Sequence, residues 1–101
     1  MKILYTEQAL VSLTETLRFL IEGQEIPIEK VVEIKSLLLN KAENLVHNPY
    51  SGQLEEHLIH LNLGHRRIIE NNIKIIYRVV DNIIYVTDFF DARQNPIKMK
   101  G

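Results

Sequence analysis

Cysteine and tryptophan are absent from the 101 residues, and glycine (four) and proline (three) are scarce. Without cysteine the chain can form neither disulfides nor thiolate metal sites. No spacing of histidine with acidic residues is typical of a metal centre. No apolar run approaches the roughly 20 residues that a membrane helix needs, and the opening segment 1–7 turns acidic too early for a signal peptide. We therefore expect a cytoplasmic protein with no metal, no cofactor and no membrane association.

Net charge is also small, at -1, but it is unevenly distributed. Residues 1–64 carry five Lys/Arg against nine Asp/Glu, whereas residues 65–101 carry seven Lys/Arg against four Asp/Glu. A positive second half suits an acidic partner or nucleic acid. The excess is nevertheless well below the basic footprint typical of a nucleic-acid-binding protein.

The first half of the chain predicts a short strand and two helices. Residues 2–5 form the strand, and Thr6 offers a side-chain oxygen as the N-cap of the first helix. Gly23 ends this helix, since glycine readily adopts the left-handed conformation there. Pro27 suits the first turn of the second helix, which ends before the turn-forming segment 48–52. Apolar residues recur at helical spacing: Leu10, Leu13, Leu17, Leu20 and Ile21, then Val31, Ile34, Leu38, Ala42 and Leu45.

The second half changes to a period of two, which is typical of strands. We expect four strands, over residues 57–63, 66–70, 73–80 and 83–88, with tight turns at Asn71-Asn72 and Asp81-Asn82. The prediction is a single α+β domain over residues 1–101. It has a short N-terminal strand, a helical hairpin and an antiparallel four-strand meander, with the helices packed on one sheet face. The other face stays open, and the tail, residues 94–101, is loosely held.

Three segments of this half carry a family resemblance: LGHRRII at 63–69, KIIYRV at 74–79 and FFDARQNP at 89–96. In this order they resemble the ParE/RelE toxin superfamily, in which a glycine precedes an arginine strand and a KIIYRV-like strand precedes a closing DxRQNP. The closing segment is more similar to the ParE, or plasmid-stabilisation, branch.

The resemblance implies the toxin of a type II toxin–antitoxin system, silenced by a cognate antitoxin. ParE-like members inhibit DNA gyrase without chemistry of their own, whereas RelE-like members are ribosome-dependent mRNA endonucleases. The weak basicity favours the ParE-like alternative, because binding to a phosphate-rich ribosome strengthens with the number of cations. A non-toxic remnant that binds its antitoxin and regulates an operon is a further alternative. Whether the protein is an enzyme stays open.

A nuclease would need cations for the phosphorane and groups that move protons. Arg67 and Arg93 could supply the cations, and Tyr77 or His60 could transfer protons. Each also has a structural interpretation. Tyr77 shares its strand parity with Ile75, which predicts a core tyrosine, and a lone strand histidine such as His60 is typically structural.

The arginines have further alternatives. Arg66 and Arg67 point to opposite faces, so one joins any given site and the other is solvated or paired with an acidic helix residue, Glu15 or Glu22. Arg93 lies at the sheet rim, where it contacts a partner or an acidic residue of its own chain. His65, beside Gly64, is expected to be an exposed turn residue. The candidates for binding the target are Arg66, Arg67, Arg78, Arg93 and Lys98.

Phe19 and Leu37 project away from the apolar arcs of their helices. Scattered exposed apolar residues need no role. If the two are adjacent across the hairpin, however, they form a patch for an antitoxin segment or for a homodimer contact.

Overall fold

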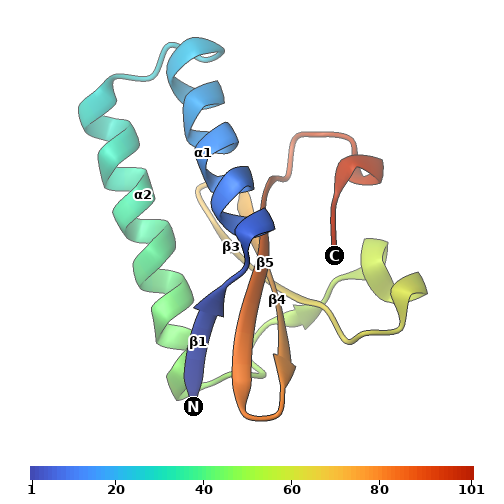
Figure 1. Ribbon diagram of the computed structural model, residues 1–101. Coiled ribbons are helices and arrows are strands. Elements are labelled where there is room, and N and C mark those ends of the chain that lie inside the picture. The colour runs from blue at the N-terminus through green and yellow to red at the C-terminus, as the bar shows by residue number, and fades with distance from the viewer.

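The protein, described here by a computed structural model of residues 1–101, places two helices against one face of a five-stranded mixed sheet (Figure 1). The strands are β1 (Lys2–Tyr5), β2 (Gln53–Leu54), β3 (Arg66–Glu70), β4 (Ile73–Val80) and β5 (Ile83–Asp91). The helices are α1 (Glu7–Glu22) and α2 (Ile28–Glu43), and three short 3-10 helices are η1 (Asn44–His47), η2 (Glu56–Leu61) and η3 (Pro96–Lys98). The α+β class and the helical hairpin were therefore predicted correctly.

The sheet itself differs from the predicted four-strand antiparallel meander. Its strand order is β1-β5-β4-β3-β2, and β1 pairs with β5 in parallel. The expected strand at residues 57–63 does not form, because this segment is the 3-10 helix η2, begun by the Glu55 carboxylate, which accepts a hydrogen bond from the His57 amide. The alternation in this segment predicted a half-buried strand, yet of its apolar residues only Leu58 is buried.

The two tight turns were predicted correctly. Asn71 and Asn72 have φ of 52° and 62°, and Asp81 and Asn82 have φ of 49° and 67°. Two consecutive left-handed residues match the twist of the flanking strands, and asparagine and aspartate tolerate this conformation best after glycine. These turns bring β3, β4 and β5 into an antiparallel unit with the predicted bounds for β3 and β4.

Helix α1 begins as expected but is rotated relative to the predicted stripe. The Thr6 side chain accepts a hydrogen bond from the Ala9 amide (3.1 Å) and caps the helix. Leu10 and Ile21, expected in the core, are instead 52% and 37% exposed. Gly23 ends the helix in a right-handed conformation (φ -86°), so its predicted left-handed role was wrong. Pro27 is the residue just before α2 rather than part of its first turn.

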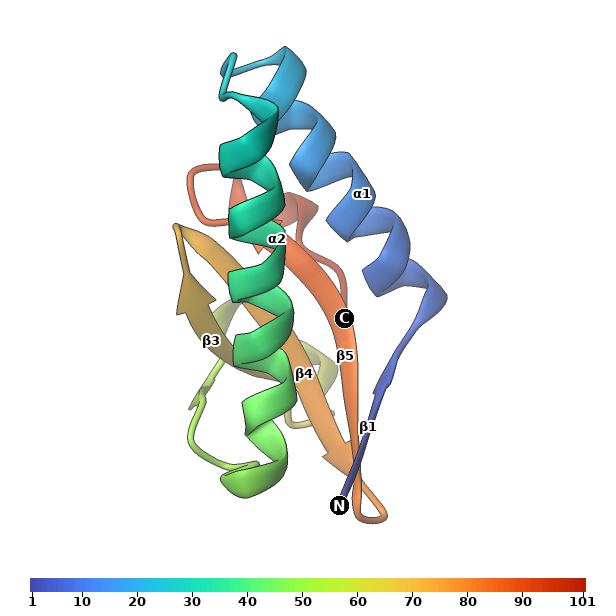
Figure 2. The same cartoon turned by 90° about the vertical axis from the view of Figure 1, so that its left-hand side faces the viewer.

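The rotation of α1 follows from polar residues that face the edge of β5. Strand β1 stops opposite Val86, so the rest of β5 has no neighbouring strand on that side. Gln8 donates to the Thr87 carbonyl (2.8 Å), Ser12 Oγ accepts from the Phe89 amide (2.8 Å) and Thr16 donates to the Phe89 carbonyl (3.3 Å). Side chains four residues apart on one helix face thus satisfy a strand edge that would otherwise be unpaired. Figure 2 shows α1 running alongside β5, with α2 in front of β3 and β4.

Each face of the sheet has its own core. The main core, 14 buried residues between the sheet and the helices, includes Ile75, Tyr77 and Phe89. The opposite face, called the far face below, carries a second core of Leu58, Ile76, Phe90 and Met99. Figure 1 shows η2 and the tail on the side of the sheet away from α2. The expectation of an open face is therefore wrong over this region.

The tail also differs at its end from the loosely held segment that the sequence predicts. Residues 94–98 are exposed, but Met99 is buried in the second core and the Lys100 amide donates to Asp88 Oδ2 (3.1 Å). A buried methionine and a charge-assisted hydrogen bond fix the end of the tail against the sheet.

Candidate functional site

The residues proposed for RNA cleavage lie on different faces of the sheet. Tyr77 is opposite Arg66 in the β3–β4 register and belongs to the main core, on the helix side. Arg67 is opposite Ile76 and therefore lies on the far face. Alternation along the strands sets this separation. The structure thus does not bring Tyr77 and Arg67 into one site.

Tyr77 is completely buried, as its strand parity predicted. Its hydroxyl oxygen accepts a hydrogen bond from the Gly52 amide (3.0 Å). Burial raises the pKa of Tyr77, so its phenol is held in the neutral form. The residue joins the loop before β2 to the sheet and has no surface from which to reach a substrate.

Arg66, like Tyr77, contacts Gly52 in the loop before β2. Its guanidinium Nη1 donates to the Gly52 carbonyl (2.7 Å), and its carbon Cζ lies 5.2 Å from the centre of the Tyr50 ring. Both contacts are to the loop before β2. One hydrogen bond and a cation–π contact restrain the side chain.

Arg67 belongs to a cluster on the far face that is built around Glu55. Its guanidinium donates to the Leu54 carbonyl (2.7 Å) and to Gln53 Oε1 (2.9 Å), and lies 3.7 Å from Glu55 Oε1. Lys74 Nζ donates to the same Glu55 oxygen at 2.9 Å. Both cations of the cluster are thus engaged within the chain, with Glu55 as their shared carboxylate.

Glu55 was not identified from the sequence, and it is completely buried. Burial alone would raise its pKa, but the hydrogen bonds from Lys74 and from the His57 amide, together with the Arg67 charge, hold that pKa below its ordinary value. One alternative left open for Arg66 or Arg67, besides solvation, was an ion pair with Glu15 or Glu22 on the first helix. That alternative was wrong, since the carboxylate comes from the segment between β2 and η2. A buried glutamate in a loop leaves no periodic signal in a sequence.

Arg78 and His65 lie close together on the far face. Arg78 Nε donates to the Leu63 carbonyl (3.1 Å). His65 is only 3% exposed, which corrects its predicted placement in an exposed turn. No hydrogen bond reaches either of its ring nitrogens. Burial, and secondarily the Arg78 charge, lower the pKa of His65, so its ring is neutral near pH 7.

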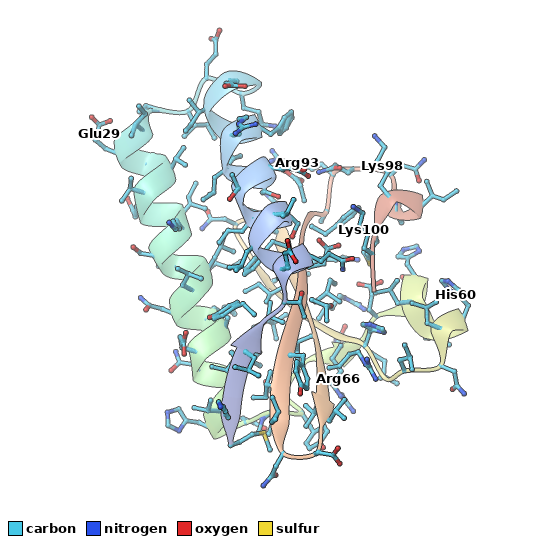
Figure 3. All side chains as sticks on the ribbon, viewed as in Figure 1. Glu29, His60, Arg66, Arg93, Lys98 and Lys100 are labelled. Carbon is cyan, nitrogen blue, oxygen red and sulfur yellow. The ribbon has the colours of Figure 1, made fainter.

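His60 lies on η2 rather than on a strand, contrary to the prediction. It lines a hollow of about 790 Å³ between η2 and the end of the tail, where His57 and Met99 are among its neighbours. Figure 3 shows His60 at the outer margin of the molecule, apart from both Arg66 and Arg93. It is therefore not placed to act together with Arg93, one of the two arginines named for catalysis.

Arg93 binds an acidic residue of its own chain, one of the two alternatives that the sequence left open. Its Nε and Nη2 atoms donate to the two carboxylate oxygens of Asp91 at 2.9 and 2.6 Å. Asp91 is buried, and the hydrogen bonds from Arg93 lower its pKa. The Arg93 side chain remains 49% exposed, so the ion pair with Asp91 covers it only in part.

Phe19 and Leu37 are both exposed, as their positions on the helices predicted. They line different hollows. Leu37 borders one of about 430 Å³ between α2 and β3. Phe19 borders one of about 450 Å³ between α1, the end of β5 and the tail, which also contains Lys98. The two side chains therefore do not form the common patch across the hairpin that the sequence left open.

Neither helix combines the length and the apolar character that crossing a membrane requires. No group of three or more histidine, aspartate or glutamate side chains is placed to hold a metal ion. No protein-family model matches the chain, and no curated protein matches it significantly.

Proposed function

We propose that the chain is a ParE-like toxin of a type II toxin–antitoxin system. In this proposal it acts in the cytoplasm by binding DNA gyrase and is neutralised by a cognate antitoxin. The membership in the ParE/RelE superfamily rests on the three sequence segments at 63–69, 74–79 and 89–96. These segments lie at the start of β3, within β4 and at the end of β5.

The separation of Tyr77 from Arg67 carries the choice of binding over catalysis. General acid–base catalysis requires the proton-transfer group and the cations within hydrogen-bond reach of one reacting phosphate. Here the tyrosine is buried on the helix side, and Arg67 is paired with Glu55 on the far face. The weak basic excess of residues 65–101 supports the same choice.

The test is to induce the protein in a bacterium and to measure growth, plasmid supercoiling and mRNA ends in the same cultures. We expect growth arrest and altered supercoiling without codon-positioned mRNA cuts. Co-expression of a cognate antitoxin, to be sought as a short acidic reading frame beside the gene, should restore growth. Codon-positioned cuts with normal supercoiling would instead favour the RelE-like endonuclease, and unaffected growth would leave the antitoxin-binding remnant.

Two matched charge reversals show whether the tail itself contacts the target. Lys98 is an exposed cation of the tail, and Lys35 is an exposed cation of α2. Lys98→Glu and Lys35→Glu change the net charge equally. If the tail contacts the target, Lys98→Glu loses toxicity and Lys35→Glu keeps it. Equal effects of the two variants would remove the tail from the proposed contact.

A further inference from the structure

A polar cleft lies between α1, the end of β5 and the tail, and it is separate from the Glu55 cluster. It has a volume of about 450 Å³. Its lining includes Ser12, Glu15, Phe19, Asp88, Lys98 and Lys100. Figure 3 shows Lys98 and Lys100 together on the tail, at the side of the molecule opposite Glu29. We call this hollow the α1–tail cleft.

An irregularity in β5 turns Asp88 towards this cleft. The register places Tyr77 opposite Val86 but Ile76 opposite Asp88, so Thr87 is an extra residue in β5. In a regular strand Asp88 would follow Val86 onto the helix side. The bulge instead sends Phe89 into the main core and Asp88 to the other side. Bulges of this kind commonly redirect a side chain beside a functional site.

Asp88 differs from the other two buried carboxylates of the protein because no lysine or arginine side chain forms an ion pair with it. Glu55 is paired with Lys74, and Asp91 with Arg93, whereas no ion pair involves Asp88. Asp88 is only 3% exposed. The Lys100 amide donates to Oδ2 (3.1 Å), and the Ser12 hydroxyl and the Lys100 charge also favour the charged carboxylate. An unpaired buried carboxylate is costly, and burial accordingly raises the pKa of Asp88.

The other walls of the cleft suit a cation that carries an apolar stem. Glu15 adds a second carboxylate, and Phe19, which is 45% exposed, adds an aromatic ring. A guanidinium can pair with carboxylate oxygens and also stack on an aromatic face, which an ammonium does less well. Lys98 and Lys100 are both exposed, so solvent and salt screen their repulsion of an incoming cation. The attraction between an incoming cation and the buried Asp88 carboxylate is screened much less.

We propose that the α1–tail cleft receives a basic side chain of a protein partner, an arginine in preference to a lysine, with Asp88 as its ion-pair partner and Phe19 as its aromatic wall. This inference rests on the proposed function only in taking the partner to be a protein. Occupancy of the cleft can be measured on the purified chain without any partner.

The experiment is a titration of the full-length ¹⁵N-labelled protein followed by two-dimensional NMR. The probes are the N-acetyl amides of arginine, lysine and glutamine. We expect arginine amide to cause saturable shifts at residues of the cleft, lysine amide to bind more weakly and glutamine amide not to bind. Asp88→Asn should weaken arginine binding about tenfold or more, the effect of one charge-assisted hydrogen bond. Glu29→Gln, which removes an exposed carboxylate of α2, should bind as the wild type does.

Urea unfolding of each variant shows whether it is folded before binding is compared. Phe19→Ala provides a second variant, because it removes an exposed ring and should reduce the preference for arginine over lysine. Arginine shifts that do not saturate, or that are equal in Asp88→Asn and Glu29→Gln, would overturn the inference. That result would leave the growth and supercoiling measurements untouched, so failure of the cleft and failure of the toxin proposal are separable.

Discussion

Replacing Tyr77 by phenylalanine removes one oxygen atom from the main core and leaves the rest of the side chain in place. The Gly52 amide, which donates to that oxygen at 3.0 Å, then has no acceptor. Both residues are buried, so water does not replace the lost partner. A buried donor without a partner costs about 1–3 kcal/mol. We therefore expect the free energy of unfolding of Tyr77→Phe to fall by about 2 kcal/mol.

The assay is urea unfolding followed by far-ultraviolet circular dichroism. With a denaturant slope of roughly 2 kcal/mol per M, the unfolding midpoint should fall by roughly 1 M. Tyr85→Phe is the matched control, because Tyr85 is half-buried on the far face and its hydroxyl has no hydrogen-bond partner in the chain. It should change the free energy of unfolding by no more than about 0.5 kcal/mol.

Two results would refute the reasoning about Tyr77. Equal midpoints for Tyr77→Phe and Tyr85→Phe would mean that the Gly52 amide does not depend on the phenol. A folded Tyr77→Phe variant that no longer arrests growth would mean that the hydroxyl takes part in chemistry. The structural role predicts toxicity that falls only as far as the folded population does.

Three further predictions concern the charged clusters and a turn. Arg93→Met should lower the free energy of unfolding by about 2 kcal/mol because Asp91 is left buried without its cation, and Asp91→Asn added to it should restore most of the loss; a double variant as unstable as the single one would contradict this. The folded pKa of Glu55 lies below its ordinary 4.5, so its stabilisation is complete above about pH 4.5 and is lost as the pH falls through the folded pKa. Unfolding measured from pH 6 to 3 should therefore show a flatter acid decline in Glu55→Gln than in the wild type, and superimposable declines would count against the cluster. Asn82 has a φ of 67°, so Asn82→Ala should cost about 1 kcal/mol and Asn82→Gly should not, which a comparison of melting temperatures can refute.

Local chemistry made several elements predictable. The Asn71-Asn72 turn was evident because few residue types tolerate two consecutive left-handed positions. The Thr6 cap was evident because only a few side chains can accept from the first helical amides. The strand parity of Tyr77 was sufficient to place it in the core. Each of these signals lies within a few residues of the feature that it specifies.

Features that depend on distant contacts were not predictable from the sequence. The segment 57–63 alternates like a strand, but no neighbour pairs with it, and the Glu55 carboxylate begins a 3-10 helix there. The apolar stripe of α1 could not show that Ser12 and its neighbours would satisfy the edge of β5, since that edge exists only where β1 ends. Glu55 itself is paired with Arg67 and Lys74, which belong to the later strands β3 and β4.

The β-bulge at Thr87 breaks the period-two pattern of β5 and places Asp88 beside the α1–tail cleft. Period-two reasoning assigns Val86 and Asp88 to the same side, and it would therefore place a carboxylate in the main core. The extra residue removes that conflict by moving Asp88 to the other side, but it leaves a buried carboxylate there without an ion pair. A regular strand with an apolar residue at 88 would avoid both costs. Residues that conflict with the local sequence pattern of their element occur most often where a protein binds a partner or catalyses a reaction. The packing of the sheet thus does not require the unpaired carboxylate beside the bulge. A basic group from a partner would supply the ion pair that Asp88 lacks.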